Sequence, residues 1–375
     1  MSNSKKIIIA GGGSGGHVFP ALSIADALNE KGISKKDIIF FGSKYSLEKT
    51  LVPENGYSIH LFPGRGVNKI KSLKYLPKNI LNVLGLIAAF FQAVFLIFKI
   101  KPAVVVGVGG FASFPAIVGA FVLRRKIVVH EQNALLGRIN KIAQKLGATV
   151  ITTFSNVNGV EKPVHLGLPL RKEVLSLVSK SRQGGGGSDL PPVGRRGAED
   201  NKKSIVIFGG SLGARIINNA VIEMSKTMSP QKEWDVTLIT GPKNLDDVDK
   251  AIGDNNFGIK VVPFVSNLFE MLANSDLVVS RAGAGSCVEL EVANVQAVLI
   301  PLAIAPGDHQ SKNASDIVAS GRAAILKEKD LNGQSLFDAI SSGLQISSTK
   351  HGASESIHLT ANIKIADYIV EHYLV

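Results

Sequence analysis

The hydrophobic pattern of the chain repeats one arrangement along its length. A continuous apolar run is followed by a glycine-rich turn and then by a segment whose apolar residues recur with helical spacing. Continuous apolar strands that alternate with helices are typical of parallel sheets covered on both faces. The chain is therefore predicted to be an α/β protein, and the clearest instances of the arrangement are residues 7–28, 104–121, 204–224 and 277–293.

The spacing of these instances predicts two domains. A chain of 375 residues with 45% hydrophobic residues can bury two cores of ordinary size. Residues 181–200 are rich in Gly, Pro and charge, which cannot build a core, so they are predicted to form a flexible surface loop, native or engineered. The expected boundaries are a first domain at 1–165, an interdomain segment at 166–203, a second domain at 204–354 and a final helix at about 355–375 that packs back on the first domain.

The first glycine-rich turn has the composition of an anion site. Gly11, Gly13 and Gly16 satisfy G-x-G-x-x-G between a predicted strand and a predicted helix. Glycines let the backbone approach an anion closely, and the helix start offers free N–H groups. A dinucleotide site also needs a carboxylate at the end of the second strand, but residues 42–44 are Gly-Ser-Lys. The turn is therefore expected to hold a phosphate, with a plain strand-to-helix turn as the alternative.

The second half of the chain repeats this arrangement. Its GGSLG turn at residues 209–213 offers N–H groups and a hydroxyl to a pyrophosphate, again with a structural turn as the alternative. Arg281 follows a later strand, and Glu289 lies about one turn into the next helix. A carboxylate there can accept both hydroxyls of a ribose, or it is simply favoured by the helix dipole. Residues 308–313, DHQSKN, follow another strand end, where amide and imidazole groups suit sugar hydroxyls.

Charge divides the chain unevenly. The net charge is +12, and residues 1–171 carry 22 Lys and Arg against 7 Asp and Glu, while the remainder carries 20 against 23. A basic half fits nucleic acid, an anionic membrane or a polyanionic substrate, and no RNA-binding signature favours nucleic acid. The single cysteine, Cys287, excludes an internal disulfide framework, and residues 1–9 lack a signal-peptide pattern. A cytoplasmic protein is expected.

One apolar segment raises the question of a membrane. Residues 80–98 contain only two polar side chains and have lysines on both sides, so they are nearly long enough to span a bilayer. A predicted parallel strand follows at once, which requires this segment as its crossover helix. We therefore expect a helix that is partly in the core and partly an exposed apolar patch with a basic rim, suited to anionic lipid. A true span is the alternative.

Polar residues also follow a strand in the first half, where HEQNALLGRIN occupies residues 130–140. Such a cluster at a carboxyl edge is more typical of a site than of a cap. By contrast, the D-x-D at Asp247 and Asp249 has the polar surroundings of a solvated helix start, and the His and Cys residues lack ligand spacing. No metal site is predicted.

Seven motifs in this order resemble the MurG family of peptidoglycan glycosyltransferases: GGGSGGHVFPAL, GVGGFASFP, HEQNALLGRIN, GLPLR, FGGSLGARIIN, SRAGAGSCVELE and PLAIAPGDHQSKNA. The resemblance covers nearly the whole chain outside residues 181–200. It implies a GT-B fold, in which two Rossmann-like domains with parallel sheets face a cleft. It also implies an inverting, metal-independent and cofactor-free transfer of GlcNAc from UDP-GlcNAc to the 4-hydroxyl of the MurNAc unit of lipid I, giving lipid II for peptidoglycan synthesis. The implied location is peripheral, on the anionic cytoplasmic face of the bacterial cell membrane.

The resemblance also implies residue roles. His17 is the expected catalytic base, because a neutral imidazole can take a hydroxyl proton near pH 7, with binding of the acceptor diphosphate as its alternative role. His309 stands where the family usually has glutamine, and Phe111 stands where it often has tyrosine. The acceptor site is expected to include Ser14, Gly15, Gly16, His17, Gly109, Gly110 and Asn133. The donor site is expected to include Arg171, Ser211, Gly210, Gly213, Val265, Arg281, Glu289, His309 and Gln310.

The residues leave other functions open. Another GT-B transferase that moves a UDP-linked sugar to a membrane lipid such as diacylglycerol fits part of the motifs. A nicotinamide-binding oxidoreductase explains the first glycine turn but neither the absent carboxylate nor the second turn. A non-enzymatic membrane-binding protein explains only the apolar segment.

Overall fold

The first half of the chain forms a parallel sheet because its strands are continuous apolar runs joined by crossover helices. The strands are β1 (Ile7–Ala10), β2 (Ile38–Ser43), β3 (Ser58–Phe62), β4 (Val104–Gly107), β5 (Lys126–Glu131), β6 (Thr149–Thr152) and β7 (Pro163–His165). The helices are α1 (Gly15–Glu30), α2 (Glu48–Glu54), α3 (Leu76–Ile100), α4 (Phe114–Val122), α5 (Arg138–Lys145) and, from the end of the chain, α14 (Ala361–Tyr373).

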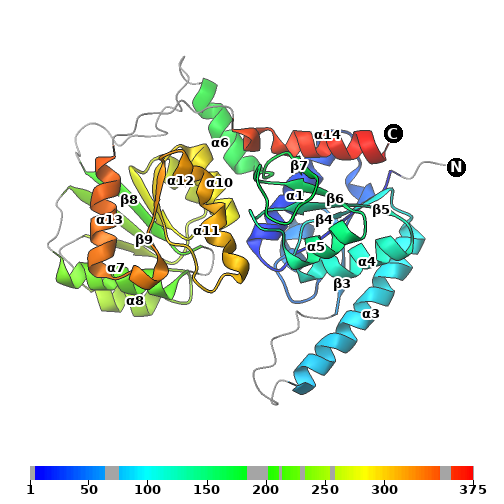
Figure 1. Ribbon diagram of the computed structural model, residues 1–375, viewed down its shortest axis with the longest axis horizontal. Helices are drawn as coiled ribbons and strands as arrows, with labels where there is room; N and C mark the ends of the chain where they lie inside the picture. Colours follow the sequence, from blue (N-terminus) through cyan, green and yellow to red (C-terminus); the bar gives the residue numbers. More distant parts are fainter. Residues whose placement is uncertain are drawn as a thin grey trace. The chain divides into compact units, whose positions relative to one another are not determined.

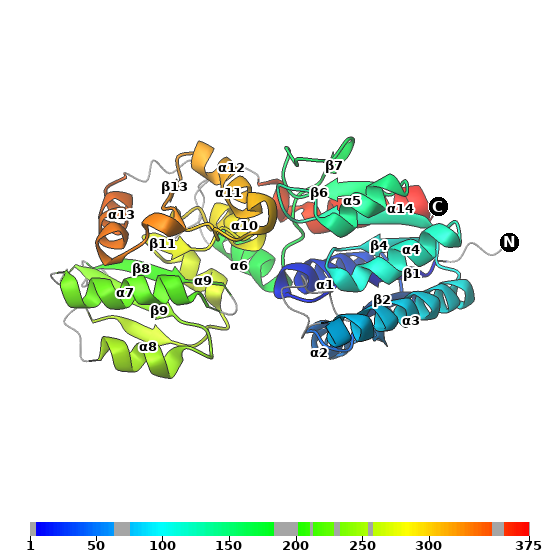
Figure 2. The same cartoon turned by 60° about the horizontal axis from the view of Figure 1, so that its bottom comes forward.

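The second half builds a similar sheet by the same alternation. Its strands are β8 (Lys203–Phe208), β9 (Trp234–Ile239), β10 (Lys260–Val262), β11 (Leu277–Ser280), β12 (Gln296–Leu299) and β13 (Ala323–Ile325). Its helices are α6 (Lys172–Gln183), α7 (Arg215–Thr227), α8 (Leu245–Ile252), α9 (Leu268–Ala273), α10 (Ala284–Ala293), α11 (His309–Asn313), α12 (Ser315–Ala319) and α13 (Gly333–Gln345). Figure 2 shows these elements from a second direction.

Both sheets have the doubly wound strand order (Figure 1). The first runs β3-β2-β1-β4-β5-β6-β7 and the second β10-β9-β8-β11-β12-β13, with parallel pairing between neighbours. The order reverses between β1 and β4 and between β8 and β11, and ligands of such sheets bind at the carboxyl ends of the strands beside the reversal. The predicted pair of Rossmann-like parallel sheets is confirmed.

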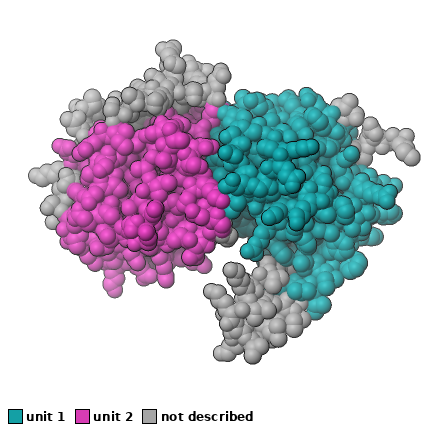
Figure 3. Space-filling view, in the orientation of Figure 1, with its two compact units in different colours: residues 1–172, 357–375 teal, residues 173–356 magenta. Residues whose placement is uncertain are grey.

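The chain divides into two compact units, residues 1–172 with 357–375 (unit 1) and residues 173–356 (unit 2) (Figure 3). The computed structural model describes residues 5–63, 76–183, 202–210, 213–228, 233–253, 258–346 and 356–374. Unit 1 therefore extends to residue 172 rather than 165, and α6 continues to Gln183, into the segment predicted as a flexible loop. Residues 184–200 of that loop lie outside the described residues.

The predicted apolar crossover helix is α3, which joins β3 to β4. Ala89, Ala93 and Ile97 are buried on one side of α3, where it packs against α4. The Cβ that Gly119 of α4 lacks would lie 3.2 Å from Ile97 Cδ1, so the two helices approach closely because of this glycine. By length and composition α3 is also apolar enough to cross a membrane, and little of it is buried.

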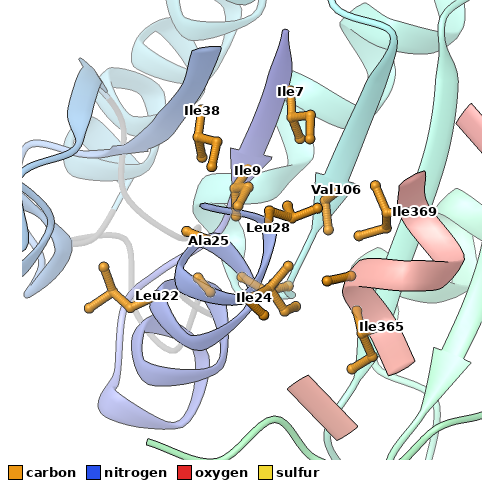
Figure 4. Packing of buried hydrophobic residues seen from close by; sticks show 14 of the residues in the cluster. Ile7, Ile9, Leu22, Ile24, Ala25, Leu28, Ile38, Val106, Ile365 and Ile369 are labelled. Atoms are coloured by element: carbon orange, nitrogen blue, oxygen red, sulfur yellow. The ribbon is translucent and has the colours of Figure 1, made fainter. Parts of the chain in front are cut away.

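The core of unit 1 is completed by the end of the chain. Ile365 and Ile369 of α14 are fully buried and lie against Ile24 and Leu28 of α1 (Figure 4). These side chains share one cluster with the apolar residues of β1, β2 and β4, so α14 covers the same face of the sheet as α1. Each such aliphatic side chain contributes about 1.5–3 kcal/mol when fully buried.

Hydrogen bonds attach the start of α14 and the residues just before it to the loop that follows β7. His358 Nδ1 accepts the Leu168 N–H at 2.9 Å. Asn362 accepts the Leu170 N–H and donates to the Leu170 carbonyl, both at 2.8 Å. The side chain of Asn362 therefore bonds both the N–H and the carbonyl of the buried Leu170. These two bonds replace the hydrogen bonds to water that the backbone loses on burial.

Two buried histidines should make unit 1 sensitive to acid. Burial lowers the pKa of His130 and of His358 to about 4 from 6.5, because the imidazolium form loses its hydration. Between those pH values the unfolded chain binds more protons than the native chain. The free energy of unfolding should therefore decrease as the pH falls from about 6.5 to 4, by up to roughly 3 kcal/mol per histidine. In thermal melts across this pH range, the melting temperature of His358→Gln should fall less with acid than that of the wild type. If the melting temperatures of the two proteins fall equally with pH, the burial of His358 is not a source of the acid sensitivity.

Candidate active site

The site of unit 1 lies where β1 and β4 diverge at the strand reversal. The turn after β1 and the GVGG turn after β4 interlock through glycines. A Cβ on Gly11 would collide with Val108, and one on Gly110 would collide with the Gly12 carbonyl oxygen. Gly110 also has φ 75°, a left-handed conformation that favours glycine. The predicted acceptor residues of the two turns are thus brought together in one unit.

The start of α1 presents free donors at this point. Ser14 is the N-cap of α1, and its carbonyl accepts the N–H groups of His17 and Val18, both at 3.1 Å. The N–H groups of Gly15 and Gly16 have no hydrogen-bond partner within the described ranges. Unpaired donors at the positive end of a 16-residue helix suit an anion.

A buried carboxylate accepts a backbone N–H group of the glycine turn after β1. Glu48, at the start of α2, is 1% exposed; its oxygens accept the Gly13 N–H at 3.1 Å and the Ser43 N–H at 2.9 Å. The Gly13 donor is therefore occupied, so an anion on this turn meets the Gly15 and Gly16 donors instead. The sequence pattern does not mark this carboxylate, because Glu48 lies several residues beyond the end of β2.

His17 stands at the edge of the turn and is half-buried. Its Nδ1 lies 3.1 Å from Gln132 Oε1, and its ring packs on Gly109, where a Cβ would lie 3.0 Å from His17 Cε1. Nε2 of His17 has no hydrogen-bond partner among the residues that the structure describes. The ring is thus held from one nitrogen and presents the other.

Within the HEQN segment at residues 130–133, Glu131 has a structural role in the loop after β5. The Glu131 carboxylate is buried and accepts four hydrogen bonds, from the Asn133 backbone and side chain, the Gly137 N–H and the Asn140 side chain. It therefore fixes the loop after β5 rather than facing a ligand. Asn133, a predicted acceptor residue, is held beside it at the same sheet edge as His17.

In unit 2 the corresponding turn follows β8. Gly210 and Gly213 have φ of 90° and 75°, and a Cβ on Gly213 would collide with the Thr240 carbonyl. Ser211, predicted to bind the donor phosphates, lies outside the described residues. The α7 helix begins at Arg215, so its N-terminus faces the carboxyl edge of the second sheet.

Arg281 is engaged within unit 2. Its guanidinium donates to the Glu328 carboxylate at 2.6 Å and to the Ile300 carbonyl at 3.1 Å, and the residue is 9% exposed. Glu328 also accepts the Ala303 N–H. The pair therefore ties the loop after β12 to the end of β11. The predicted contact of Arg281 with the donor stays a prediction.

Three further predicted donor residues, Glu289, His309 and Gln310, follow β11 and β12, whereas Val265 follows β10 on the other side of the strand reversal. Glu289 lies half-buried in α10. Gln310 accepts the Leu302 N–H at 3.0 Å, which fixes its amide beside His309 at the start of α11. Val265 lies between β10 and α9, at the carboxyl edge of the same sheet.

Arg171 is the exception among the predicted donor residues, because it belongs to unit 1. Its guanidinium lies 5.1 Å from the centre of the Phe19 ring of α1, within the range of a cation–π contact.

Both halves of the chain are similar to a known family of glycosyltransferases. The N-terminal domain model of glycosyltransferase family 28 matches residues 7–152, and the C-terminal domain model of that family matches residues 204–367. A UDP-N-acetylglucosamine–N-acetylmuramyl-(pentapeptide) pyrophosphoryl-undecaprenol N-acetylglucosamine transferase of Carboxydothermus hydrogenoformans is 34% identical over 87% of this chain and 85% of its own. The enzyme of the same name from Leuconostoc citreum is 33% identical over 89% and 88%. The chain belongs to the MurG family.

Solved structures agree with this fold. The crystal structure of MurG from Acinetobacter baumannii matches 98% of this chain and 99% of its own with a TM-score of 0.73 at 23% identity. The calicheamicin glycosyltransferase CalG4 matches with a TM-score of 0.67 at 15% identity, over 100% of this chain and 99% of its own. At these identities the likeness concerns the fold alone.

Proposed function

We propose that this MurG family member transfers GlcNAc from UDP-GlcNAc to the 4-hydroxyl of the MurNAc unit of lipid I, giving lipid II for peptidoglycan synthesis. The names of its relatives support the reaction. The observation that carries it is the pair of glycine turns, one at the strand reversal of each sheet, each opening a helix. Two anion sites of this kind suit two diphosphate substrates.

The two units have different expected substrates. Unit 1 would hold the acceptor diphosphate on the donors of Gly15 and Gly16, beside His17 and Asn133. Unit 2 would hold UDP-GlcNAc, with Gly210, Gly213 and Ser211 at the phosphates, Glu289 at the ribose, and His309 with Gln310 at the sugar. A nicotinamide cofactor is disfavoured in unit 1, because the Glu48 carboxylate is only 1% exposed and is held by two backbone N–H groups rather than presented to a ribose.

The proposed chemistry is a single inverting displacement. His17 Nε2 takes the proton of the acceptor 4-hydroxyl while that oxygen attacks C1 of GlcNAc. The C1–O bond to the β-phosphate breaks on the opposite face, and its electron pair leaves with UDP. The N-terminus of α7 and its glycine N–H groups would stabilise the charge that develops on the leaving diphosphate.

An assay with radiolabelled UDP-GlcNAc and a soluble lipid I analogue tests this function. Labelled product with a β-glycosidic bond, identified by NMR, is expected from inversion of the α-linked donor. Transfer to diacylglycerol but not to the lipid I analogue would instead favour the other lipid-directed transferase, and an α-linked product would contradict inversion.

We also propose that the reaction needs no metal ion. No group of three or more His, Cys, Asp or Glu side chains with a metal-binding arrangement occurs within the described ranges, and Asp247 and Asp249 are exposed on α8. Turnover should therefore be unchanged by EDTA. Loss of activity that Mg²⁺ or Mn²⁺ restores would show that a metal replaces the helix N-terminus in this role.

The apolar side of α3 is the proposed membrane-facing surface, at the cytoplasmic face of the cell membrane. Its exposed side chains recur every three or four residues, opposite the side that packs on α4. They are Leu84, Ile87, Phe91, Phe95 and Phe98, with Phe121 and Val122 exposed at the end of the neighbouring α4. An exposed stripe on a helix whose other side is buried favours lying on a bilayer over crossing it.

Cations border this surface. A cavity of about 380 Å³ beside Phe121 is lined by Arg124, Arg125 and Lys126. Nε of Arg125 is buried and has no hydrogen-bond partner among the residues that the structure describes. Positive charge next to an apolar surface suits the phosphates of anionic lipids. Of the lysines predicted to form the rim, Lys69, Lys71 and Lys74 lie outside the described residues, and Lys78 lies in the first turn of α3. Lys99, in the last turn of α3, and Lys101, just after this helix, are exposed.

Serine at Phe91, Phe95 and Phe98 together should weaken binding to anionic vesicles roughly 10-fold or more, since each ring is about two-thirds exposed and would lose burial in lipid. Vesicle sedimentation measures this, and the affinity for UDP-GlcNAc should not change. Phe264→Ser is the matched control, because Phe264 is 62% exposed in unit 2. Equal vesicle binding by the triple variant would exclude this surface.

A further inference from the structure

A buried row of polar side chains leads from His17 into unit 1. His17 Nδ1 lies 3.1 Å from Gln132 Oε1, Gln132 Nε2 lies 3.1 Å from His130 Nδ1, and His130 Nε2 lies 2.9 Å from the Gly167 carbonyl. Gln132 is 3% exposed and His130 is fully buried. The Gly167 carbonyl at the buried end of the row can only accept a hydrogen bond, so the protons along the row can be assigned one contact at a time from that end.

His130 begins the assignment. Its Nε2 faces a carbonyl oxygen, which can only accept, so Nε2 must carry a proton. Burial keeps the ring neutral near pH 7, as its low pKa reflects. A neutral imidazole has one proton, so Nδ1 of His130 is bare and accepts a hydrogen bond.

The orientation of the Gln132 amide determines which nitrogen of His17 carries the proton. One end of its amide lies near three acceptors: His130 Nδ1 at 3.1 Å, the Val108 carbonyl at 3.0 Å and the His130 carbonyl at 3.2 Å. That end must be the NH₂ group, since an oxygen there would face acceptors only. The amide oxygen therefore faces His17 Nδ1, which must donate to it.

We infer that Gln132 is a positioning residue that holds neutral His17 with its proton on Nδ1 and its lone pair on Nε2. The inference rests on the proposed function of His17 as the base, and it explains how Nε2 is kept ready to accept the proton of the acceptor hydroxyl. Without this contact the proton is free to move to Nε2, and that nitrogen could no longer act as a base.

An amide meets both requirements of this position, whereas a carboxylate does not. Aspartate or glutamate could accept from His17, but it would face Val108 O, His130 O and His130 Nδ1 without a proton to donate. A carboxylate would also stabilise the imidazolium form of His17 and so hinder its action as a base at neutral pH. Glutamine accepts on one side, donates on the other and adds no charge.

The tautomer can be measured directly in the free protein. Long-range ¹H–¹⁵N correlation spectra of ¹⁵N-histidine-labelled protein distinguish Nδ1–H from Nε2–H, and His17→Asn identifies the His17 signals. We expect neutral His17 as the Nδ1–H form and His130 as the Nε2–H form. Neutral His17 in the Nε2–H form would overturn the inference. Because this measurement needs no substrate, it decides the inference even if no transfer to lipid I is detected.

Variants of Gln132 test the consequence for catalysis. Gln132→Met, which keeps the length but removes both polar contacts, should shift His17 toward Nε2–H and lower kcat roughly 10- to 100-fold with little change in the affinity for UDP-GlcNAc. Gln132→Glu should move the acidic limb of the kcat profile to higher pH. Gln144→Met is the matched control, since Gln144 bonds the Gly159 carbonyl of the same unit and should leave both readouts unchanged.

Together, the tautomer and kcat of Gln132→Met distinguish the positioning role of Gln132 from the role of His17 as the base. An unchanged His17 tautomer in Gln132→Met would overturn the positioning role. A changed tautomer with unchanged kcat would support that role and would instead contradict His17 as the base. If Gln132→Met does not fold, the spectrum of the wild-type protein still decides which nitrogen of His17 carries the proton.

Discussion

Alanine in place of His17 should lower kcat for GlcNAc transfer roughly 100-fold or more, with near-normal binding of UDP-GlcNAc. His17 lies in the first turn of α1, beside Gly15 and Gly16. Its Nε2 and the N–H groups of these two glycines have no hydrogen-bond partner in the described part of the chain. A base must be neutral to accept a proton, so wild-type kcat should fall on the acidic side of its pH profile. The acidic limb of the profile should be absent in the variant.

The competing role for His17 gives a different kinetic result. If the imidazole only binds the acceptor diphosphate, His17→Ala should keep kcat and raise the KM for the lipid I analogue. His60→Ala is the control, because His60 lies exposed on β3 and should leave kcat and both KM values unchanged. A raised acceptor KM alone would assign His17 as a phosphate ligand and leave the base to be found elsewhere.

The second large effect is expected from Glu289→Ala, which should weaken UDP-GlcNAc binding by roughly 1.5–3 kcal/mol. That corresponds to a Kd higher by about 10- to 150-fold. The reason is the loss of the charge-assisted hydrogen bonds that the two ribose hydroxyls would donate to the carboxylate. Calorimetric titration with UDP-GlcNAc measures the change without any acceptor.

Glu291 supplies a matched control on the same helix. It also lies in α10 and is half-buried, but it accepts a hydrogen bond from Ser356 at 3.0 Å. Glu291→Ala should bind UDP-GlcNAc normally, although its stability can change. Equal affinity of Glu289→Ala and wild type would remove Glu289 from the donor site.

The fold was predictable because its signals are local. An apolar run, a glycine turn and a helical pattern lie within about 20 residues of one another, as β1 with α1 and β8 with α7 show. The apolar segment that became α3 was also predicted as a crossover helix from the strand that follows it. The helix α6 was not predicted: residues 166–203 were predicted only as an interdomain segment, and the flexible loop was expected from residue 181, inside the last turn of α6.

The contacts that shape the sites were less predictable, because they join residues far apart in the chain. Glu48 reaches Gly13 across 35 residues, and Gln132 reaches His17 across 115. Arg281 was predicted from its place after a strand, but its pairing with Glu328 depends on how the β12 loop folds back. Sequence patterns indicate which sheet edge a side chain occupies, whereas hydrogen-bond partners follow only from the packed structure.

The return of the chain to unit 1 has a consequence for synthesis on the ribosome. Unit 2 occupies residues 173–356, so its whole sequence is made before α14 exists. Until Ile365 and Ile369 emerge, the face of α1 that they cover stays open to water, and the Leu168 and Leu170 backbone lacks its partners His358 and Asn362. Unit 1 is therefore the first unit to be synthesised and the last to complete its fold. A nascent chain that stops before residue 357 exposes an apolar surface, to which chaperones or proteases can bind.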